Sequence, residues 1–160
     1  MKKPLSNSAQ KVQDYLSGQG YDLKVIERDD STRTAAEAAE SVGCKVGQIA
    51  KSLIFRNKRD SSPILIVASG ANRVDTKKVS AVLGFKLGRA DGNYVKEHVG
   101  FAIGGIPPVG HLNKLQTILD PDLKKYDSIW AAAGTPHALF EITPDALQDI
   151  TDGIWVELAE

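Results

Sequence analysis

Lys51 is the first residue whose type and position suggest chemistry. It opens the segment 51–56 (Lys-Ser-Leu-Ile-Phe-Arg), which is expected to form a largely apolar strand. Burying an ammonium group in such a strand is costly unless it meets an anion. Lys51 is therefore a candidate ligand for a negatively charged group. The alternative is a lysine whose stem packs along the sheet edge while its ammonium stays in solvent, as most lysines do.

The segment 104–110 (Gly-Gly-Ile-Pro-Pro-Val-Gly) is a second candidate. Gly104 and Gly105 permit backbone angles that other residues avoid, and they let a ligand approach the main chain. The two prolines after Ile106 lack N–H groups and stiffen the loop. The amides near Gly105 and Ile106 would then be fixed in place, and fixed amides stabilise negative charge that develops on a carbonyl oxygen. An ordinary tight turn between strands explains the same spacing equally well.

Small and polar residues near two expected strand ends could line the same pocket. Ala132, Ala133 and Gly134 leave room beside one strand end, and His137 follows where its ring could hydrogen-bond a ligand. Ser69 ends another apolar run and offers a hydroxyl. The alternatives are ordinary ones: a lone loop histidine is often only a surface residue, and Ser69 could merely begin a loop.

Several enzyme classes lack their motifs in this sequence. The three histidines, His98, His111 and His137, are too few and too scattered for a typical zinc site. There is no Gly-x-Ser-x-Gly elbow, no phosphate-binding Gly-x-x-x-x-Gly-Lys-Ser/Thr loop and no Gly-x-Gly-x-x-Gly. The single Cys44 excludes an intrachain disulfide and a cysteine-cluster metal site. Serine hydrolase, nucleotide and metal chemistry therefore have no local support.

The overall composition is typical of one soluble domain. With 160 residues, of which 42% are hydrophobic, the chain can fill one core. Twenty Lys and Arg balance twenty Asp and Glu, which argues against a strongly basic nucleic-acid coat and against a DNA partner, but permits a small basic patch. The polar start does not resemble a signal peptide, and no apolar stretch is long enough to cross a membrane. We expect a cytoplasmic protein without a membrane partner.

The elements that must position these residues mix helices and strands. Periodicity and capping signals predict helices at 6–18, 34–43 (with a capping box of Thr34 and Glu37), 75–83, 91–99 and from Pro144 onward, with a helical turn at 46–50. Strands are predicted at 22–27, 51–56, 63–68, 101–103, 116–119, 128–132, 139–142 and 154–158. Segment 63–68 is apolar on both faces, which predicts a central strand. This order predicts an α/β (α+β) fold: a single domain over residues 1–160, with a mixed, mostly antiparallel sheet flanked by helices.

Taken in order, four segments resemble the YbaK/prolyl-tRNA-editing family, which includes the insertion domain of bacterial-type prolyl-tRNA synthetases. The resemblance covers nearly the whole chain. Its segments are 49–55, then 64–70 with 75–79, then 101–108 with the family's Gly-x-x-x-Pro loop, and finally 129–141. Each segment alone is weak evidence, but the four segments in this order and at these separations are specific to the family.

The resemblance implies an enzyme that hydrolyses the ester between a mischarged amino acid and the terminal adenosine of tRNA. In the family, the lysine equivalent to Lys51 helps to position the terminal nucleotide, and the backbone equivalent to Gly104 through Pro108 holds the aminoacyl carbonyl. The resemblance also implies that no metal or organic cofactor is needed. The implied partners are the acceptor end of mischarged tRNA and prolyl-tRNA synthetase.

The identity of the amino acid is less determined by the sequence. Small residues around Ala132, Ala133 and Gly134 favour a small side chain on proline tRNA, the tRNA being inferred from family analogy. The cysteine-specific branch of the family has a serine and an aspartate in the segment where this chain has Ala132 and Leu139. This difference argues against cysteine as the amino acid removed and leaves alanine, serine or threonine open. Two other functions stay open: a non-catalytic module of the same fold that binds tRNA or a synthetase, and a hydrolase of another small ester or amide.

Overall fold

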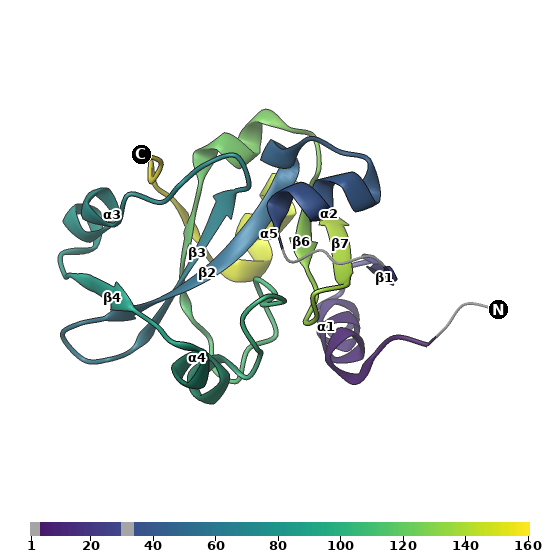
Figure 1. Cartoon of the computed structure of the whole chain (residues 1–160), viewed down its shortest axis with the longest axis horizontal. Coiled ribbons are helices and arrows are strands. Elements are labelled where there is room, and N and C mark those ends of the chain that lie inside the picture. The colour runs from purple at the N-terminus through teal and green to yellow at the C-terminus, as the bar shows by residue number, and fades with distance from the viewer. Residues whose placement is uncertain (1–3, 30–33) are drawn as a thin grey trace.

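A mixed β-sheet with helices on both faces forms the framework of the molecule (Figure 1), in a computed structural model that describes residues 4–29 and 34–160. The strands of this described part are β1 (Val25–Glu27), β2 (Ile49–Asn57), β3 (Pro63–Ser69), β4 (Leu87–Arg89), β5 (Gln116–Leu119), β6 (Ile129–Ala132), β7 (Ala138–Ile142) and β8 (Ile154–Trp155). The α-helices are α1 (Asn7–Gly18), α2 (Ala35–Val42), α3 (Thr76–Leu83), α4 (Gly92–Val99) and α5 (Pro144–Thr151). Two short 3₁₀-helices, η1 (Val46–Gln48) and η2 (Pro121–Lys125), complete the set.

The strand order is β1-β7-β6-β2-β3-β5-β8, and β4 pairs with β2 outside this path. The pairings β2–β6, β3–β5 and β5–β8 are parallel, and the pairings β1–β7, β6–β7, β2–β3 and β2–β4 are antiparallel. This arrangement confirms the predicted α/β (α+β) fold with a mixed, mostly antiparallel sheet.

Strand β2 has an incomplete second edge, and this edge shapes the site described below. One edge of β2 pairs with β3 from Ala50 to Arg56. On the other edge, β6 pairs only with Ile49 and Ala50, whereas β4 pairs only from Phe55 to Asn57. Within the described part of the chain, residues 51–54 therefore have no strand partner on that side.

Local capping explains where the helices begin and end. The Thr34 hydroxyl accepts a hydrogen bond from the Glu37 amide and donates one to the Glu37 carboxylate, both at 3.1 Å. Asp75 and Asp91 accept from first-turn amides of α3 and α4 in the same way. Gly43 ends α2 with a left-handed conformation, φ 71°. The helix boundaries predicted from these signals are confirmed.

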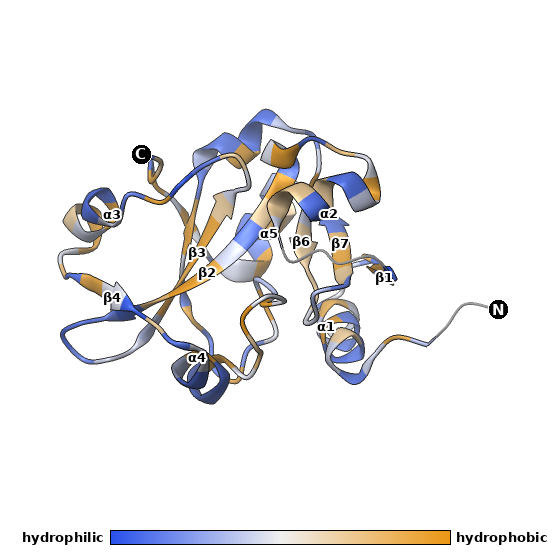
Figure 2. Cartoon of the chain, viewed as in Figure 1, coloured by the Kyte–Doolittle hydropathy of each residue, from blue (hydrophilic) through white to orange (hydrophobic). Residues whose placement is uncertain are grey.

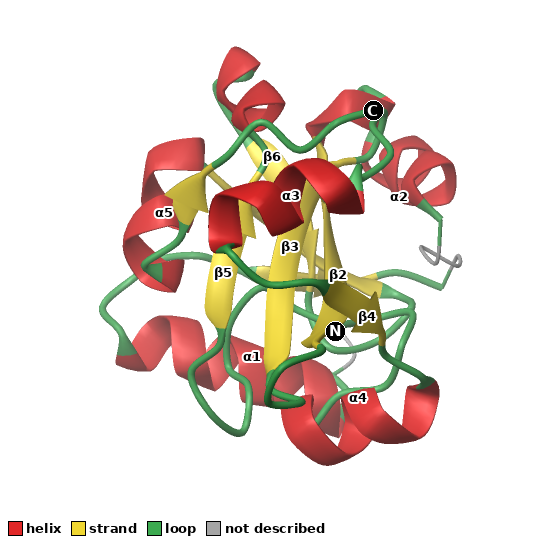
Figure 3. Cartoon of the chain, turned by 90° about the vertical axis from the view of Figure 1, so that its left-hand side faces the viewer, coloured by secondary structure: helices red, strands yellow, loops and turns green. Residues whose placement is uncertain are grey.

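The core lies on both faces of the central strand β3, as predicted for an apolar run at the centre of a sheet. Leu65 and Val67 pack in the larger cluster with α1, α4 and α5, whereas Ile64 and Ile66 pack beneath Val79 of α3. Figure 3 shows α3 lying across this second face, and Figure 2 shows the hydrophobic colouring of β3 against the hydrophilic turn that joins it to β2. Strand β3 is thus buried on both faces.

The strand predicted at 101–103 is wrong, because this segment is a loop. The segment has no strand partner in the described structure: Phe101 is buried at 5% exposure, whereas Ile103 is 58% exposed and lines the cavity described below. Gly104 then takes φ 103° and turns the chain. An apolar triplet between two glycines cannot form a strand without a neighbour to accept its backbone hydrogen bonds.

The remaining differences concern lengths and short elements. Strands β1 and β8 are shorter than the predicted segments 22–27 and 154–158, β2 begins two residues before Lys51, and the helical turn at 46–50 is η1. Strand β4 and η2 were not predicted. No helix among the described residues is both long and apolar enough to cross a membrane.

Candidate active site

The open edge of β2 borders a cavity of about 300 Å³, and five of the predicted site residues line it: Lys51, Gly104, Gly105, Ile106 and Ala132. These residues come from β2, from the loop after α4 and from the end of β6. The walls between them are largely apolar and include Ala35, Ala38, Ile54, Ala90, Val95 and Leu139. A cavity of this size with few polar groups is suited to a small ligand or to the end of a larger one.

Lys51 is the charged group of this cavity. Its side chain is half-buried, and its ammonium Nζ donates a hydrogen bond to the Asn72 carbonyl oxygen at 2.8 Å. Burial lowers the pKa of Lys51, and the positive charge of Arg73 lowers it further, while Asp120 acts in the opposite direction. An ammonium group has three N–H donors, so the bond to Asn72 leaves donors for an anionic or polar ligand.

A buried carboxylate fixes the carbonyl that holds Lys51. Asp120 is 1% exposed, and its carboxylate accepts hydrogen bonds from the Ser69 amide at 3.0 Å and from the Asn72 side-chain amide at 2.8 Å. The Asn72 side chain also donates to Asp122 at 2.7 Å. Sequence reasoning missed this network, although an Asp-Pro pair directly after an apolar strand is a recognisable cap signal.

Ser69, predicted to line the pocket, is instead buried next to it and hydrogen-bonds the surrounding chain. The residue is 2% exposed, and its hydroxyl donates to the Gly47 carbonyl oxygen at 2.7 Å. It is not among the residues that line the cavity with Lys51. Its hydroxyl and its amide both hold the chain around the end of β3.

The loop 104–106 presents its main chain to the cavity. Gly105 lies so close to the neighbouring backbone that an added Cβ would stand 2.6 Å from the Thr135 carbonyl carbon. The Gly134 amide donates to the Gly105 carbonyl oxygen at 2.8 Å, which ties this loop to the segment after β6. Only glycine fits at this contact.

The amides of Gly105 and Ile106 are the donors of interest. Both residues are buried, yet no hydrogen bond in the described part of the chain engages either N–H group. Buried backbone donors are nearly always paired, because leaving them unpaired costs about as much as a lost hydrogen bond. A ligand in the adjoining cavity would supply the missing acceptor.

His111 holds the other end of this loop. One ring nitrogen, Nε2, lies 2.7 Å from the Pro107 carbonyl oxygen, and the ring packs edge-on against Phe101. Because a carbonyl oxygen only accepts, Nε2 must carry the proton and donate. Burial lowers the pKa of His111, against a smaller opposing effect of this hydrogen bond, which favours the neutral ring. The histidine that was considered only as a zinc ligand is therefore a brace for the loop.

The depressed pKa of His111 predicts a pH-dependent stability. The unfolded chain binds a proton near pH 6.5, whereas the folded chain does so only at lower pH, so stability is full above this value and falls as the pH drops below it. Urea unfolding at pH 7.5 and 5.5 should show a larger loss for the wild type than for His111→Gln, whose side chain does not titrate. Equal losses in the two proteins would contradict this reading.

Three other predicted residues lie away from the cavity. Pro108 is buried and lines a separate hollow of about 410 Å³ that also includes His111. Ala133 is fully buried in the core, and its amide donates to the Ala138 carbonyl oxygen at 2.9 Å. Gly134 turns the chain at φ 96° and contacts the loop at Gly105 through its amide.

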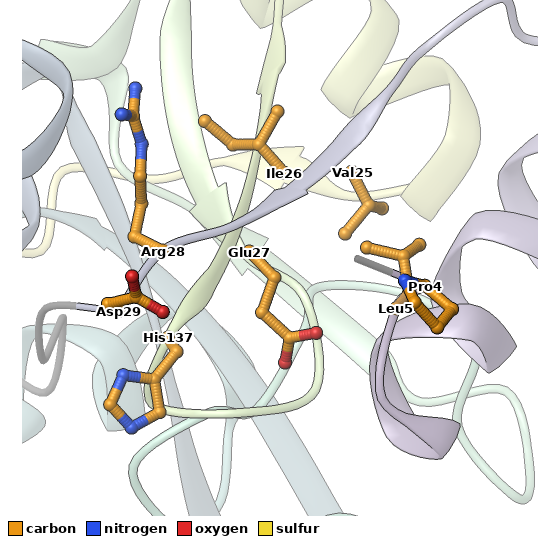
Figure 4. A pocket seen from close by; sticks show the side chains of 8 residues that line it. All are labelled: Pro4, Leu5, Val25, Ile26, Glu27, Arg28, Asp29 and His137. Carbon is orange, nitrogen blue, oxygen red and sulfur yellow. The ribbon is translucent and has the colours of Figure 1, made fainter. Parts of the chain in front are cut away.

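His137 lines a different hollow, of about 670 Å³ (Figure 4). Its neighbours there include Glu27 and Asp29, and its carbonyl oxygen accepts from the Arg28 amide at 2.8 Å. The Glu27 carboxylate accepts from the amide and the hydroxyl of Ser6, each at 2.8 Å. Figure 4 shows the side chains of Glu27, Asp29 and His137 around one opening, so the structure separates His137 from Lys51.

Comparison with known proteins agrees with the resemblance seen in the sequence. Residues 29–150 match the sequence profile of the aminoacyl-tRNA editing domain. The uncharacterized protein YwhH of Bacillus subtilis (strain 168) is 32% identical over 154 residues, which cover 96% of this chain and 98% of that protein. EbsC of Enterococcus faecalis (strain ATCC 700802 / V583), named as a candidate Cys-tRNA(Pro)/Cys-tRNA(Cys) deacylase, is 27% identical over 128 residues, which cover 78% of this chain and 76% of that protein.

A solved structure is also similar over its full length. A protein described as a candidate trans-editing enzyme for prolyl tRNA synthetase is 47% identical, with a TM-score of 0.93, and the match covers 98% of this chain and 99% of that one. The profile match alone covers well over half of the sequence. The chain therefore belongs to the aminoacyl-tRNA editing domain family.

Proposed function

We propose that this protein hydrolyses the ester of mischarged tRNA, acting in trans on a small amino acid attached to proline tRNA. The observation that carries the proposal is one cavity lined by Lys51 and by Gly105 and Ile106, two residues whose amides have no hydrogen-bond partner in the described structure. Family membership supports the reaction class, and the similarity to proteins named for prolyl-tRNA editing supports the tRNA. Prolyl-tRNA synthetase is the proposed protein partner.

The mechanism needs no protein nucleophile, because an aminoacyl ester is already activated. The protein has to orient the ester and stabilise the tetrahedral intermediate. Lys51 binds the terminal nucleotide, and the amides of Gly105 and Ile106 donate to the oxyanion. Water attacks the carbonyl carbon, aided by the free ribose hydroxyl of the substrate. The bond from that carbon to the ribose oxygen then breaks, the ribose oxygen takes a proton, and amino acid and uncharged tRNA leave.

The amino acid is selected by the size of the space left for it. The cavity is lined by the methyl groups of Ala35, Ala38 and Ala132 and by larger apolar side chains around them. A space of about 300 Å³ that also receives part of a terminal nucleotide leaves little room for a bulky side chain. A cramped pocket rejects the cognate proline by steric clash, which is how such a site spares correctly charged tRNA.

A deacylation panel tests the function directly. The purified protein is incubated with alanyl, seryl, threonyl, cysteinyl and prolyl esters of proline tRNA, and the release of free amino acid is measured. We expect hydrolysis of at least one small ester and none of the prolyl ester. Binding of these tRNAs without any hydrolysis would show that the protein is a binding module and not an enzyme. Failure of uncharged tRNA to compete would instead favour a hydrolase of another small ester.

A further inference from the structure

The neutral total charge conceals a strong separation of charge along the chain. Segment 56–89 carries eight of the 20 basic residues and only two of the 20 acidic ones, a net charge of +6, and the rest of the chain carries −6. The charged parts of this segment are the β2–β3 turn, α3 and β4. They lie together at one end of the molecule, on the left of Figure 1 and facing the viewer in Figure 3.

The basic side chains at this end are open to solvent. The exposed ones are Lys58, Arg59, Arg73, Lys77, Lys78, Lys86 and Arg89. In the part of the chain that the structure describes, none of them forms a salt bridge with an acidic side chain. Their positive charge is thus not cancelled by the protein itself, and it attracts a polyanion.

Three of these lysines surround one hollow of about 540 Å³ between α3 and β4. Lys58, Lys77 and Lys86 line it, together with the hydroxyl-bearing Thr76 and Ser80. The Lys58 amide donates to the Lys86 carbonyl oxygen at 3.0 Å, which holds the turn against the residue before β4. Lysine ammonium groups and hydroxyls are the typical protein contacts of a nucleic-acid phosphate backbone. We call this hollow the basic groove.

Strand β4 connects the basic groove with the cavity beside Lys51. Leu87, at its start, lines the groove, and Ala90, just past its end, lines the cavity. From Leu87 to Ala90 an extended chain spans about 10 Å, so the groove and the cavity meet opposite ends of one short strand. Arg73 adds positive charge near Lys51, whose pKa it lowers.

We propose that the basic groove binds backbone phosphates of the tRNA acceptor stem while the charged 3′ end occupies the cavity. This inference rests on the proposed function. RNA fits better than an acidic protein surface, because one polyanion can place phosphates in the groove at the start of β4 and its aminoacyl end in the cavity past the end of β4. The lysines contact phosphate and not base edges, so the groove contributes affinity and orientation without reading the sequence of the tRNA.

The test uses two matched double charge reversals, all at exposed positions. Lys77→Glu/Lys86→Glu alters the groove, and Lys24→Glu/Lys45→Glu is the control outside segment 56–89. Each protein is assayed with full-length alanyl-tRNA and with the alanyl ester of a CCA trinucleotide, which has no stem. The groove variant should raise KM for the full-length substrate about tenfold or more. The slope of log binding constant against log salt concentration should become shallower by about two. Both variants should hydrolyse the trinucleotide ester within twofold of the wild type.

The outcomes separate this inference from the proposed function. Unchanged KM and salt dependence for full-length tRNA in the groove variant would overturn the inference while leaving the function standing. If the wild type hydrolyses neither substrate, the function fails, and fluorescence anisotropy with uncharged tRNA still tests the groove through weaker binding of the variant. Loss of binding to prolyl-tRNA synthetase with unchanged tRNA binding would assign the groove to an acidic protein and overturn the inference. Thermal unfolding checks that the variants are folded.

Discussion

Replacing Lys51 with alanine is expected to lower the rate of deacylation by about a hundredfold or more, because the lost contact to the terminal nucleotide leaves the ester misplaced relative to the loop amides. The ammonium is held beside the cavity by the Asn72 carbonyl oxygen, and no other lysine or arginine lines this cavity in the described structure. The missing charge therefore has no local substitute. The measurement is kcat/KM with the best substrate of the ester panel.

The fold should survive this substitution. Lys51 is half-buried, and burial disfavours its charge and lowers its pKa, so alanine at this position leaves no buried charge without a partner. The melting temperature should stay close to that of the wild type. Lys45→Ala, at an exposed position away from the cavity lining, is the matched control and should keep full activity. Near wild-type activity of the Lys51→Ala protein would show that Lys51 has no role in the reaction.

Gly105→Ala is the second substitution with a large expected effect. The added Cβ would lie 2.6 to 2.7 Å from the backbone atoms of Thr135, and backbone cannot move aside as a flexible side chain can. The loop must shift, and with it the amides of Gly105 and Ile106. We expect a loss of about a hundredfold in rate, as for other displaced oxyanion donors, and about 1–3 kcal/mol of stability from overpacking.

A glycine in open space provides the control for this substitution. Gly92, at the start of α4, has no atom within 4 Å of an added Cβ. Gly92→Ala should leave activity unchanged and keep or slightly raise stability, since alanine favours the helix. Equal activity of the Gly105→Ala and Gly92→Ala proteins would show that the loop amides do not take part in the reaction.

The fold was predictable from the sequence where the signals are local. Thr34 and Asp75 cap their helices with hydrogen bonds to residues two or three positions away, so their types and spacing suffice. Strand β4 and the loop at 101–103 behave differently. Whether either segment forms a strand depends on a pairing partner far away in the sequence. Strand β4 pairs with β2, whereas 101–103 has no pairing partner among the described residues.

The site was predictable only in part for the same reason. Spacing identified Lys51 and the loop at Gly104 as separate candidates, and family resemblance suggested that they act together. Their meeting depends on the gap left between β4 and β6 along β2, which no local pattern encodes. His137 was grouped with them because it follows Ala132 closely, yet the turn at Gly134 carries it to another hollow.

The deacylase mechanism depends on one cavity that receives the aminoacyl end of tRNA between Lys51 and the loop amides. A crystal structure with a stable analogue, in which an amide replaces the ester of 3′-alanyl-adenosine, tests this directly. We expect the ligand in the cavity, with its carbonyl oxygen within hydrogen-bond distance of the Gly105 or Ile106 amide and Lys51 beside the nucleotide. Binding of the analogue in the hollow beside His137, with this cavity empty, would contradict the mechanism.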